Sequence, residues 1–210
     1  MTEPTRDFSK EAATWDDKPG RVKVAHAIAE AIIGAVPITP DMTALDFGCG
    51  TGLLTLRLQP LVRSIVGVDS SPGMLSVLEQ KVSQQRLTNV CWQCIDFEEG
   101  SMPQGRFTLI TSAMTLHHVR EVEPLLAWFF QALAPGGLLC LADLDLEDGL
   151  FHEDNTGVFH FGLDRAWLEQ QLTVAGFTGV QAMTATEIEK PAADGVLRRF
   201  PVFLLHAQKP

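Results

Sequence analysis

With 210 residues, of which 46% are hydrophobic and 20% charged, the chain has the proportions of an ordinary globular protein, and we expect one folded domain. Its formal net charge of −10 disfavours nucleic acids and anionic membranes as partners, so a small molecule fits better. No apolar run approaches the roughly 20 residues that cross a bilayer, and the start lacks signal-peptide features, so we expect a cytoplasmic protein.

The first two thirds of the chain alternate between helical and strand patterns. Residues 7–20 are polar and end in Lys18-Pro19-Gly20, which indicates a loose N-terminal segment. Ser71 followed by Pro72 is typical of a helix start. The predicted elements are helices at 21–35, 51–58, 71–82 and 122–133, and strands at 43–47, 64–69, 89–95, 107–112 and 138–144.

The final third of the chain has a different pattern. Asp164 is placed to cap a helix that runs to Gly176, and strand-like stretches follow near 177–188 and 196–207. Residues 190–195 between them read as a hairpin loop. The whole pattern predicts an α/β fold: a doubly wound, Rossmann-like, mostly parallel sheet of seven strands with an antiparallel C-terminal hairpin at one edge.

Three glycines, Gly48, Gly50 and Gly52, follow the first predicted strand. Glycines at the carboxyl end of a parallel strand let a ligand approach the backbone, and the next helix adds N–H donors. A dinucleotide fingerprint, G-x-G-x-x-G, would need glycine where the chain has Leu53. Asp46, two residues before the turn, suits a ligand that carries positive charge.

Two further acids follow the next two predicted strands. Asp69 ends the second strand, 21 residues after Gly48, where an acid commonly binds both ribose hydroxyls. Asp96 follows the third strand between Ile95 and Phe97, which together suit an adenine ring and its amino group. The sequence therefore predicts a pocket for an adenosine that carries a positive charge.

Five stretches of the sequence carry a family resemblance: LDFGCGTG (45–52), VGVDSSPGML (66–75), CIDFEEG (94–100), FTLITSAMTLHHV (107–119) and LAPGGLLCLADL (133–144). With these motifs the chain resembles the class I S-adenosylmethionine-dependent methyltransferases, in particular the small-molecule branch that includes ubiquinone and menaquinone biosynthesis enzymes. The resemblance implies S-adenosylmethionine as cofactor and methyl transfer to a small-molecule acceptor in a single domain, 21–210.

The resemblance also implies roles for individual cofactor-binding residues. Gly48, Cys49 and Gly50 would line the methionine part of the cofactor, and Asp46 would support its amino group, directly or through water. The other implied contacts are Asp69, Ser70 and Met74 at the ribose, Asp96 and Phe97 at the adenine, and Ser112, just past the fourth strand, near the methionyl end.

The acceptor side of the predicted pocket is less defined by the sequence. Residues 143–164 mix acids, histidines and three phenylalanines, so we interpret them as a substrate-covering insertion. His117, His152 and His160 are candidate general bases, needed only where the acceptor must lose a proton. His117 and His118 could instead pack structurally or line the acceptor pocket.

The sequence shows no metal-site spacing that we recognise, so no metal site is predicted. Asp145, Glu147, Asp148, His152 and His160 are possible ligands but follow no known pattern. Cys91 and Cys94, three apart in a strand, should point to opposite faces and not converge on a metal.

Two further functions stay open besides the methyltransferase. One is an NAD-dependent oxidoreductase, which Leu53 and Asp46 argue against, and the other is a module that binds the cofactor without catalysis. Residues 1–20 resemble the family's lead-in, and we expect them to form a lid in which Phe8 and Trp15 close the pocket. The acceptor, its nucleophilic atom and the oligomeric state do not follow from the sequence.

Overall fold

The computed structural model describes residues 6–97, 100, 102–192 and 194–210. The first five residues of the predicted lid, Glu98 and Glu99 of the motif at 94–100, and Ala193 of the hairpin loop lie outside the described residues. No helix within the described part of the chain is long and apolar enough to cross a membrane.

Seven strands form a single sheet in the order β3-β2-β1-β4-β5-β7-β6. The strands β1 to β5 run parallel, whereas β7 runs antiparallel to both β5 and β6. Their bounds are β1 Thr43–Phe47, β2 Ser64–Asp69, β3 Val90–Cys94, β4 Phe107–Ala113, β5 Leu133–Leu144, β6 Thr178–Pro191 and β7 Leu197–Gln208. The predicted fold class, with its antiparallel hairpin edge, is confirmed.

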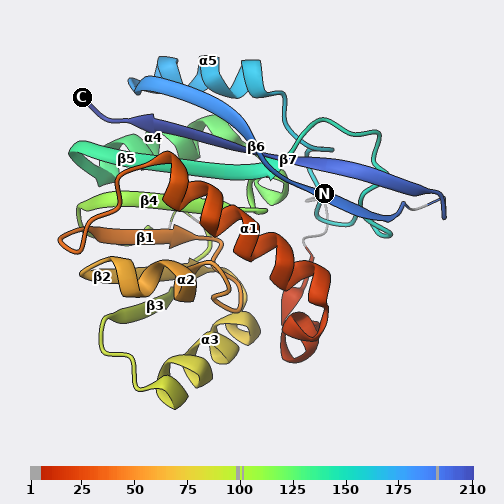
Figure 1. The fold of residues 1–210 in the computed structure, drawn as a ribbon, viewed down its shortest axis with the longest axis horizontal. Helices are drawn as coiled ribbons and strands as arrows, with labels where there is room; N and C mark the ends of the chain where they lie inside the picture. Colours follow the sequence, from red (N-terminus) through yellow and green to blue (C-terminus); the bar gives the residue numbers. More distant parts are fainter. Residues whose placement is uncertain (1–5, 98–99, 101, 193) are drawn as a thin grey trace.

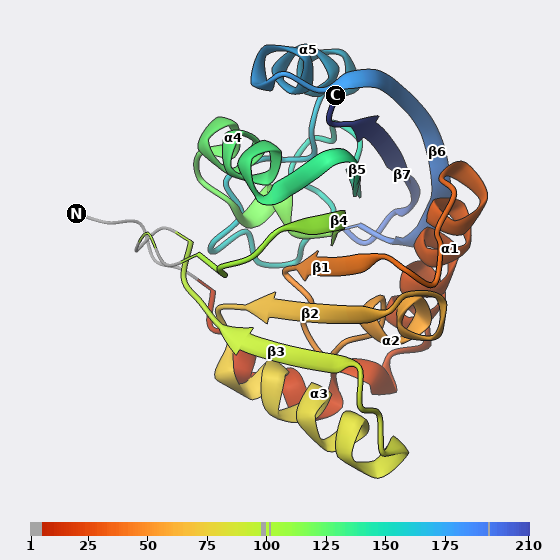
Figure 2. The same ribbon diagram turned by 90° about the vertical axis from the view of Figure 1, so that its left-hand side faces the viewer.

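Helices cover both faces of this sheet and give three layers (Figures 1 and 2). One face carries α1 (Pro19–Ala35), α2 (Thr55–Leu58) and α3 (Pro72–Gln85), and the other carries α4 (Val122–Ala132) and α5 (Arg165–Ala175). Each face has its own buried apolar cluster. Strands β4 and β5 lie between the two clusters, which explains why their sequences are nearly continuous apolar runs.

Local signals set the ends of the helices as predicted. The hydroxyl of Ser71 accepts a hydrogen bond from the N–H of Met74, and the carboxylate of Asp164 accepts one from the N–H of Trp167. Both are N-caps that satisfy a free donor in the first turn. Gly176 ends α5 in the left-handed conformation (φ 106°), a backbone region that glycine adopts most easily.

Four details differ from the sequence-based expectations. The helix predicted at 51–58 begins only at Thr55, because the glycine turn continues through residue 54. Ser112 lies inside β4 instead of just past it. β5 begins at Leu133, directly where α4 ends, and not at residue 138. The fourth difference concerns the N-terminal segment.

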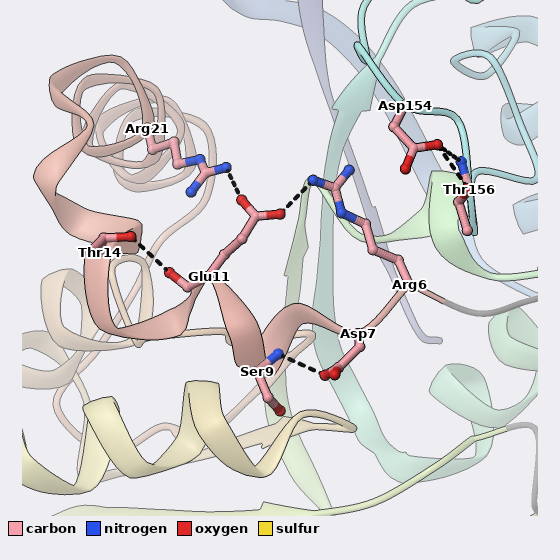
Figure 3. A network of polar contacts seen from close by, with 8 residues as sticks. All are labelled: Arg6, Asp7, Ser9, Glu11, Thr14, Arg21, Asp154 and Thr156. Atoms are coloured by element: carbon pink, nitrogen blue, oxygen red, sulfur yellow. Dashed lines mark hydrogen bonds and ion pairs between the residues drawn. The ribbon is translucent and has the colours of Figure 1, made fainter.

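The N-terminal segment is folded, although its polar sequence indicated a loose one. It contains two short 3₁₀ helices, η1 (Phe8–Lys10) and η2 (Ala12–Asp17), which lie beside α3 (Figure 1). The carboxylate of Glu11 binds the guanidinium groups of Arg6 and Arg21 at 2.6 and 2.8 Å (Figure 3). These two ion pairs lower the pKa of Glu11 to about 2 and tie the segment to α1.

Candidate functional site

The glycine turn lies at the carboxyl end of β1, against the loop that follows β4. Gly48 has a φ of 70°, and a Cβ added there would lie 2.2 Å from the hydroxyl oxygen of Thr115 and 2.7 Å from its Cβ. The N–H groups of Gly48 and Cys49 both donate to the carbonyl oxygen of Val68 at 2.8 and 3.0 Å. Glycine is therefore required at position 48 by its backbone conformation and by the close approach of Thr115.

Asp69 connects this turn to the start of α3. One carboxylate oxygen accepts the N–H of Gly50 at 2.8 Å, and the other accepts the N–H of Ser71 at 2.9 Å. Burial raises the pKa of Asp69, while these backbone donors oppose the rise. Ser70 is exposed beside it, and Met74 is buried in the first turn of α3. Four of the residues predicted to contact the ribose or the methionine part of the cofactor thus lie close together, namely Gly50, Asp69, Ser70 and Met74.

Asp46 faces the interior of the protein rather than the glycine turn. Its carboxylate accepts hydrogen bonds from the hydroxyls of Thr55 (2.6 Å) and Thr111 (2.9 Å), and the residue is 1% exposed. Burial raises its pKa to about 6, although the two hydroxyls favour the charged form. Because the carboxylate of Asp46 is buried and points to these two hydroxyls, direct contact with a ligand amino group would need another side-chain position.

The raised pKa of Asp46 predicts a pH dependence of stability. Between about pH 4 and pH 6 the folded chain holds a proton on Asp46 that the unfolded chain has lost, so stability falls as the pH rises through this window. An Asp46→Asn variant has no such titration. Wild type should therefore lose on the order of 2 to 3 kcal/mol relative to the variant between pH 4 and pH 7.

Urea unfolding of both proteins at several pH values measures this difference. A difference in unfolding free energy that stays constant with pH would show that Asp46 titrates normally despite its burial.

The remaining predicted cofactor residues lie around the same sheet edge. Asp96 is exposed just after β3, and Phe97 packs edge-to-face against Phe47 with ring centroids 6.1 Å apart. Cys49 is buried, and burial raises the pKa of its thiol well above the ordinary value. Ser112 is also buried, and its hydroxyl has no hydrogen-bond partner among the described residues. A hydroxyl without a partner is a candidate for contact with a ligand or water.

The N-terminal segment covers the glycine turn and the start of α3. The hydroxyl of Ser9 lies 2.9 Å from that of Ser71 and accepts the N–H of Gly73 at 3.3 Å. Asp16 accepts a hydrogen bond from Thr51 at 2.7 Å and pairs with Lys81. The segment therefore contacts the residues that flank the predicted cofactor site.

Aromatic rings of the same segment reach the loop after β4. The ring of Phe8 lies 5.9 Å from that of Trp15 and 5.0 Å from that of His118, both edge-on. The guanidinium of Arg21 stacks on Trp15 at 3.4 Å from the ring centroid. Phe8 thus lies between Trp15 and a cluster of histidines.

Three imidazole rings, those of His117, His118 and His152, meet beyond the end of β4. Nδ1 of His117 lies 2.6 Å from a carboxylate oxygen of the buried Asp143, at the end of β5. The ring of His152 lies 5.2 Å from that of His117 and 5.6 Å from that of His118. Two of the predicted base candidates are therefore neighbours.

The third base candidate, His160, is not part of the cluster. Its Nε2 lies 2.9 Å from the backbone carbonyl oxygen of Val119. Because a carbonyl only accepts, Nε2 of His160 donates this bond and fastens the segment after β5 to the loop after β4. This contact gives His160 a structural function.

The ionisation of the cluster follows mainly from burial and from the interactions among its members. Burial alone would raise the pKa of Asp143, but its electrostatic interaction and hydrogen bond with His117, together with backbone N–H donors, outweigh burial and lower the pKa. Burial and the neighbouring His117 lower the pKa of His118 to about 3 and that of His152 to about 4. His118 and His152 are therefore neutral imidazoles at neutral pH.

Residues 143–164 fold over the loop after β4. The N–H of Phe159 donates to the carbonyl oxygen of His117 at 2.9 Å, and Nδ1 of His118 donates to the carbonyl oxygen of Gly157 at 2.6 Å. Phe151 packs edge-to-face on Phe200 of β7, with centroids 5.1 Å apart. The segment thus lies between the histidines and the C-terminal hairpin.

The acids of this segment have other partners and do not gather with His152. Asp145 binds Arg165 through two hydrogen bonds of 2.6 Å, and Glu147 accepts the N–H groups of Leu150 and Phe151 at 2.6 and 3.0 Å. The possible ligand set that mixed these acids with His152 and His160 is therefore not assembled. Cys91 and Cys94 are both exposed on the edge strand β3 as free thiols.

Sequence reasoning missed three residues that organise the site. Asp143, the partner of His117, ends an apolar strand as Asp69 does, and this position was the available signal. Thr115, which packs on Gly48, and Ser9, which contacts Ser71 and Gly73, have no sequence signal. Their roles come from contacts between segments more than 60 residues apart.

Comparisons with known proteins show which domains this chain is similar to. Residues 44–137 match the family model described as a methyltransferase domain. An uncharacterized methyltransferase of Schizosaccharomyces pombe is 30% identical over 135 residues, which cover 58% of this chain and 48% of that protein. The ubiquinone biosynthesis O-methyltransferase of Coxiella burnetii is 29% identical over 141 residues, which cover 66% and 60%. The aligned regions span about half to three fifths of the length of these curated relatives.

A solved structure shows the same fold. Phosphoethanolamine N-methyltransferase 2 of Haemonchus contortus, in complex with S-adenosyl-L-methionine, superposes with a TM-score of 0.72 at 16% identity. The match covers 98% of this chain and 60% of that one. At this identity the similarity establishes the architecture only.

Proposed function

We propose that this chain is a class I S-adenosylmethionine-dependent methyltransferase and transfers a methyl group from S-adenosylmethionine to a small-molecule acceptor. One observation carries the proposal: the carboxylate of Asp69 is bonded to the N–H of Gly50, at the edge where β1 and β2 both end. An acid held beside a glycine turn in this way commonly accepts hydrogen bonds from the ribose hydroxyls of a nucleotide. The structure of the Haemonchus contortus enzyme in complex with S-adenosyl-L-methionine, which has the same fold, supports the choice of cofactor.

The residues present fit this cofactor. Gly48 and Gly50 keep the turn free of side chains, and Asp69 with Ser70 offers polar groups to a ribose. Phe97 and the exposed Asp96 provide an apolar face and a carboxylate for an adenine. We assign the following cofactor contacts: Asp46, Gly48, Cys49, Gly50, Asp69, Ser70, Met74, Asp96, Phe97 and Ser112. Asp46 is buried against Thr55 and Thr111 and would act on the cofactor through water or after rotation of its carboxylate.

The chemistry needs little from the protein besides binding and orientation. S-adenosylmethionine, when bound, supplies an electrophilic methyl carbon and a neutral sulfur leaving group. The acceptor would bind next to the methionine end of the cofactor, on the side of the histidines. Thr115 packs on Gly48 of the glycine turn, and the first histidine, His117, follows two residues later. Enclosure by Phe8 and by residues 143–164 excludes water and fixes the acceptor in line.

An oxygen acceptor that must lose its proton would use His117 or His152. His117 has Asp143 to orient its ring and to stabilise a proton on it, as a general base requires. His160 is engaged by Val119 and is the weakest of the three predicted candidates. Glutamine at each position, with turnover measured across pH, would separate them.

Calorimetric titration tests the proposed cofactor. The full chain is titrated separately with S-adenosylmethionine, S-adenosylhomocysteine and NAD. Micromolar binding of the two sulfur compounds without NAD binding supports the methyltransferase. Binding of NAD alone would instead support the oxidoreductase alternative, which Leu53 disfavours. Cofactor binding without turnover on any acceptor would favour the non-catalytic module.

Removal of residues 1–18 tests the proposed lid. The truncated chain should bind S-adenosylmethionine about tenfold more weakly, a loss of roughly 1.4 kcal/mol, because Ser9, Phe8 and Asp16 no longer enclose the turn. The core should stay folded, since α1 begins at Pro19.

The matched control for the truncation is Glu11→Gln. This change breaks the ion pairs to Arg6 and Arg21 but leaves the lid in the chain, so the affinity should fall less. Equal affinity of the truncated and complete chains would exclude a lid function.

A further inference from the structure

The histidine cluster brings together nitrogens of three rings, which general-base catalysis by a single imidazole does not require. One nitrogen from each of His117, His118 and His152 lies within 4.8 Å of the other two. The three residues come from two separate segments, the short helix η4 (Leu116–His118) and the segment after β5. Packing alone places no requirement on three ring nitrogens to face one another.

The hydrogen bonds of the cluster fix which nitrogens are available. Nδ1 of His118 must donate to the carbonyl of Gly157, and Nδ1 of His117 donates to the carboxylate of Asp143. Because His118 is a neutral imidazole, its Nε2 keeps a lone pair, and the neutral form of His117 has one on Nε2 as well. Nε2 of His152 is buried without a hydrogen-bond partner among the described residues. Three imidazole nitrogens this close together can bind a cation when each presents its lone pair.

We propose that His117, His118 and His152 bind a divalent transition-metal ion, with zinc as the best fit. Imidazole nitrogens select zinc and similar ions over magnesium or calcium, which prefer oxygen ligands. Three protein ligands leave a coordination position open, as in catalytic zinc sites. In tetrahedral zinc sites the ligand nitrogens are about 3.3 Å apart, given bonds of 2.0 to 2.1 Å. Side-chain shifts on the order of 1 Å would bring the three nitrogens from within 4.8 Å of one another to this spacing.

Asp143 completes the arrangement from outside the ligand set. A carboxylate that accepts the other N–H of a metal-binding histidine orients the ring and raises its basicity. Asp143 is 0% exposed and supplies a negative charge close to the ion. Two positive charges, Arg6 and Lys190, also act on His152, and Arg6 shares the carboxylate of Glu11 with Arg21.

The location gives the ion a function that rests on the proposed methyl transfer. The cluster lies under Phe8, after Thr115, and therefore on the acceptor side of the glycine turn. An ion with an open position there would bind an acceptor through an anionic oxygen or a thiolate. The substrate class is thus a small molecule with an ionisable hydroxyl or thiol, rather than an amine.

Titration with Co²⁺ and Zn²⁺ tests the site directly. The full chain, freed of metal and of any purification tag, is titrated with Co²⁺ while visible absorption is recorded, and Zn²⁺ is then added as competitor. We expect one ion per chain with micromolar or tighter affinity. His152→Gln and His118→Gln should each weaken binding at least 100-fold, and Asp143→Asn about 10- to 100-fold.

Two control variants and a folding measurement accompany the titration. His26 on α1 and His206 on β7 lie outside the cluster, so His26→Gln and His206→Gln should bind as wild type does. Thermal unfolding of each variant identifies misfolded proteins, and the half-buried His152 gives a variant that should remain folded.

Three results would overturn the metal site. These are the absence of stoichiometric binding to folded wild type, wild-type affinity in His152→Gln, and binding of Mg²⁺ in preference to Zn²⁺. Calorimetry with S-adenosylmethionine on the same metal-free protein keeps the two proposals apart. Cofactor binding without metal binding removes only the metal site, whereas metal binding without cofactor binding removes only the methyltransferase.

Discussion

Replacement of Asp69 by alanine is expected to weaken S-adenosylmethionine binding by at least about 100-fold. The carboxylate is the proposed partner of the ribose, and hydrogen bonds to a charged group contribute roughly 1.5 to 3 kcal/mol each. It also fixes the N–H groups of Gly50 and Ser71 at 2.8 and 2.9 Å. The variant therefore loses a direct contact and the support of the turn together.

Asp69→Asn and Asp41→Ala separate these two effects. Asparagine accepts hydrogen bonds through one oxygen only and should give an intermediate loss in calorimetry. Asp41 is exposed and pairs only on the surface, with Arg63 at 3.0 Å, so its removal should leave the affinity unchanged. Wild-type affinity in a folded Asp69→Ala protein would place the cofactor elsewhere.

The second large effect is expected for stability, from Gly48→Ala. An alanine at φ 70° lowers the free energy of unfolding by roughly 1 to 2 kcal/mol. Its methyl group would also clash with the side chain of Thr115, including the Cβ, which cannot rotate away. Overpacking of this kind adds roughly 1 to 3 kcal/mol. We expect a total loss of about 2 to 5 kcal/mol in the free energy of urea unfolding, measured without cofactor.

Gly50→Ala is the matched control for this substitution. Gly50 also has a positive φ, 53°, but an added Cβ would have no atom within 4 Å. It should therefore lose only the backbone contribution. Adding Thr115→Gly to Gly48→Ala should recover the part that comes from overlap. Equal losses for the two alanine variants would mean that Thr115 moves aside freely.

Much of the fold and of the cofactor side followed from local sequence patterns. The caps Ser71 and Asp164, the apolar run of β5 and the hairpin are encoded within a few residues of where they act. The glycine turn and Asp69 follow from the rule that ligands bind where parallel strands end. These features need no knowledge of which distant segments meet.

The features that could not be predicted are contacts between distant segments. The pairing of His117 with Asp143 depends on β4 and β5 lying side by side in one register. The N-terminal segment was expected to be loose, because its polar residues reveal nothing of the ion pairs that Glu11 forms. Asp46 was assigned to the cofactor amino group from its place in a motif, whereas the threonines that enclose it come from α2 and β4.

The proposed cofactor contacts and the proposed substrate cover come from different parts of the chain, and this separation has an evolutionary consequence. The proposed cofactor contacts lie between residues 46 and 112, whereas the proposed substrate cover is formed by residues 143–164, which contact the hairpin through Phe151 and Phe200. The family match ends at residue 137, before that cover begins. New acceptor preferences can therefore arise by divergence or exchange of residues 143–164 while the cofactor-binding part of the chain stays unchanged. Chimeras joined within β5 are the natural way to reproduce that history in the laboratory.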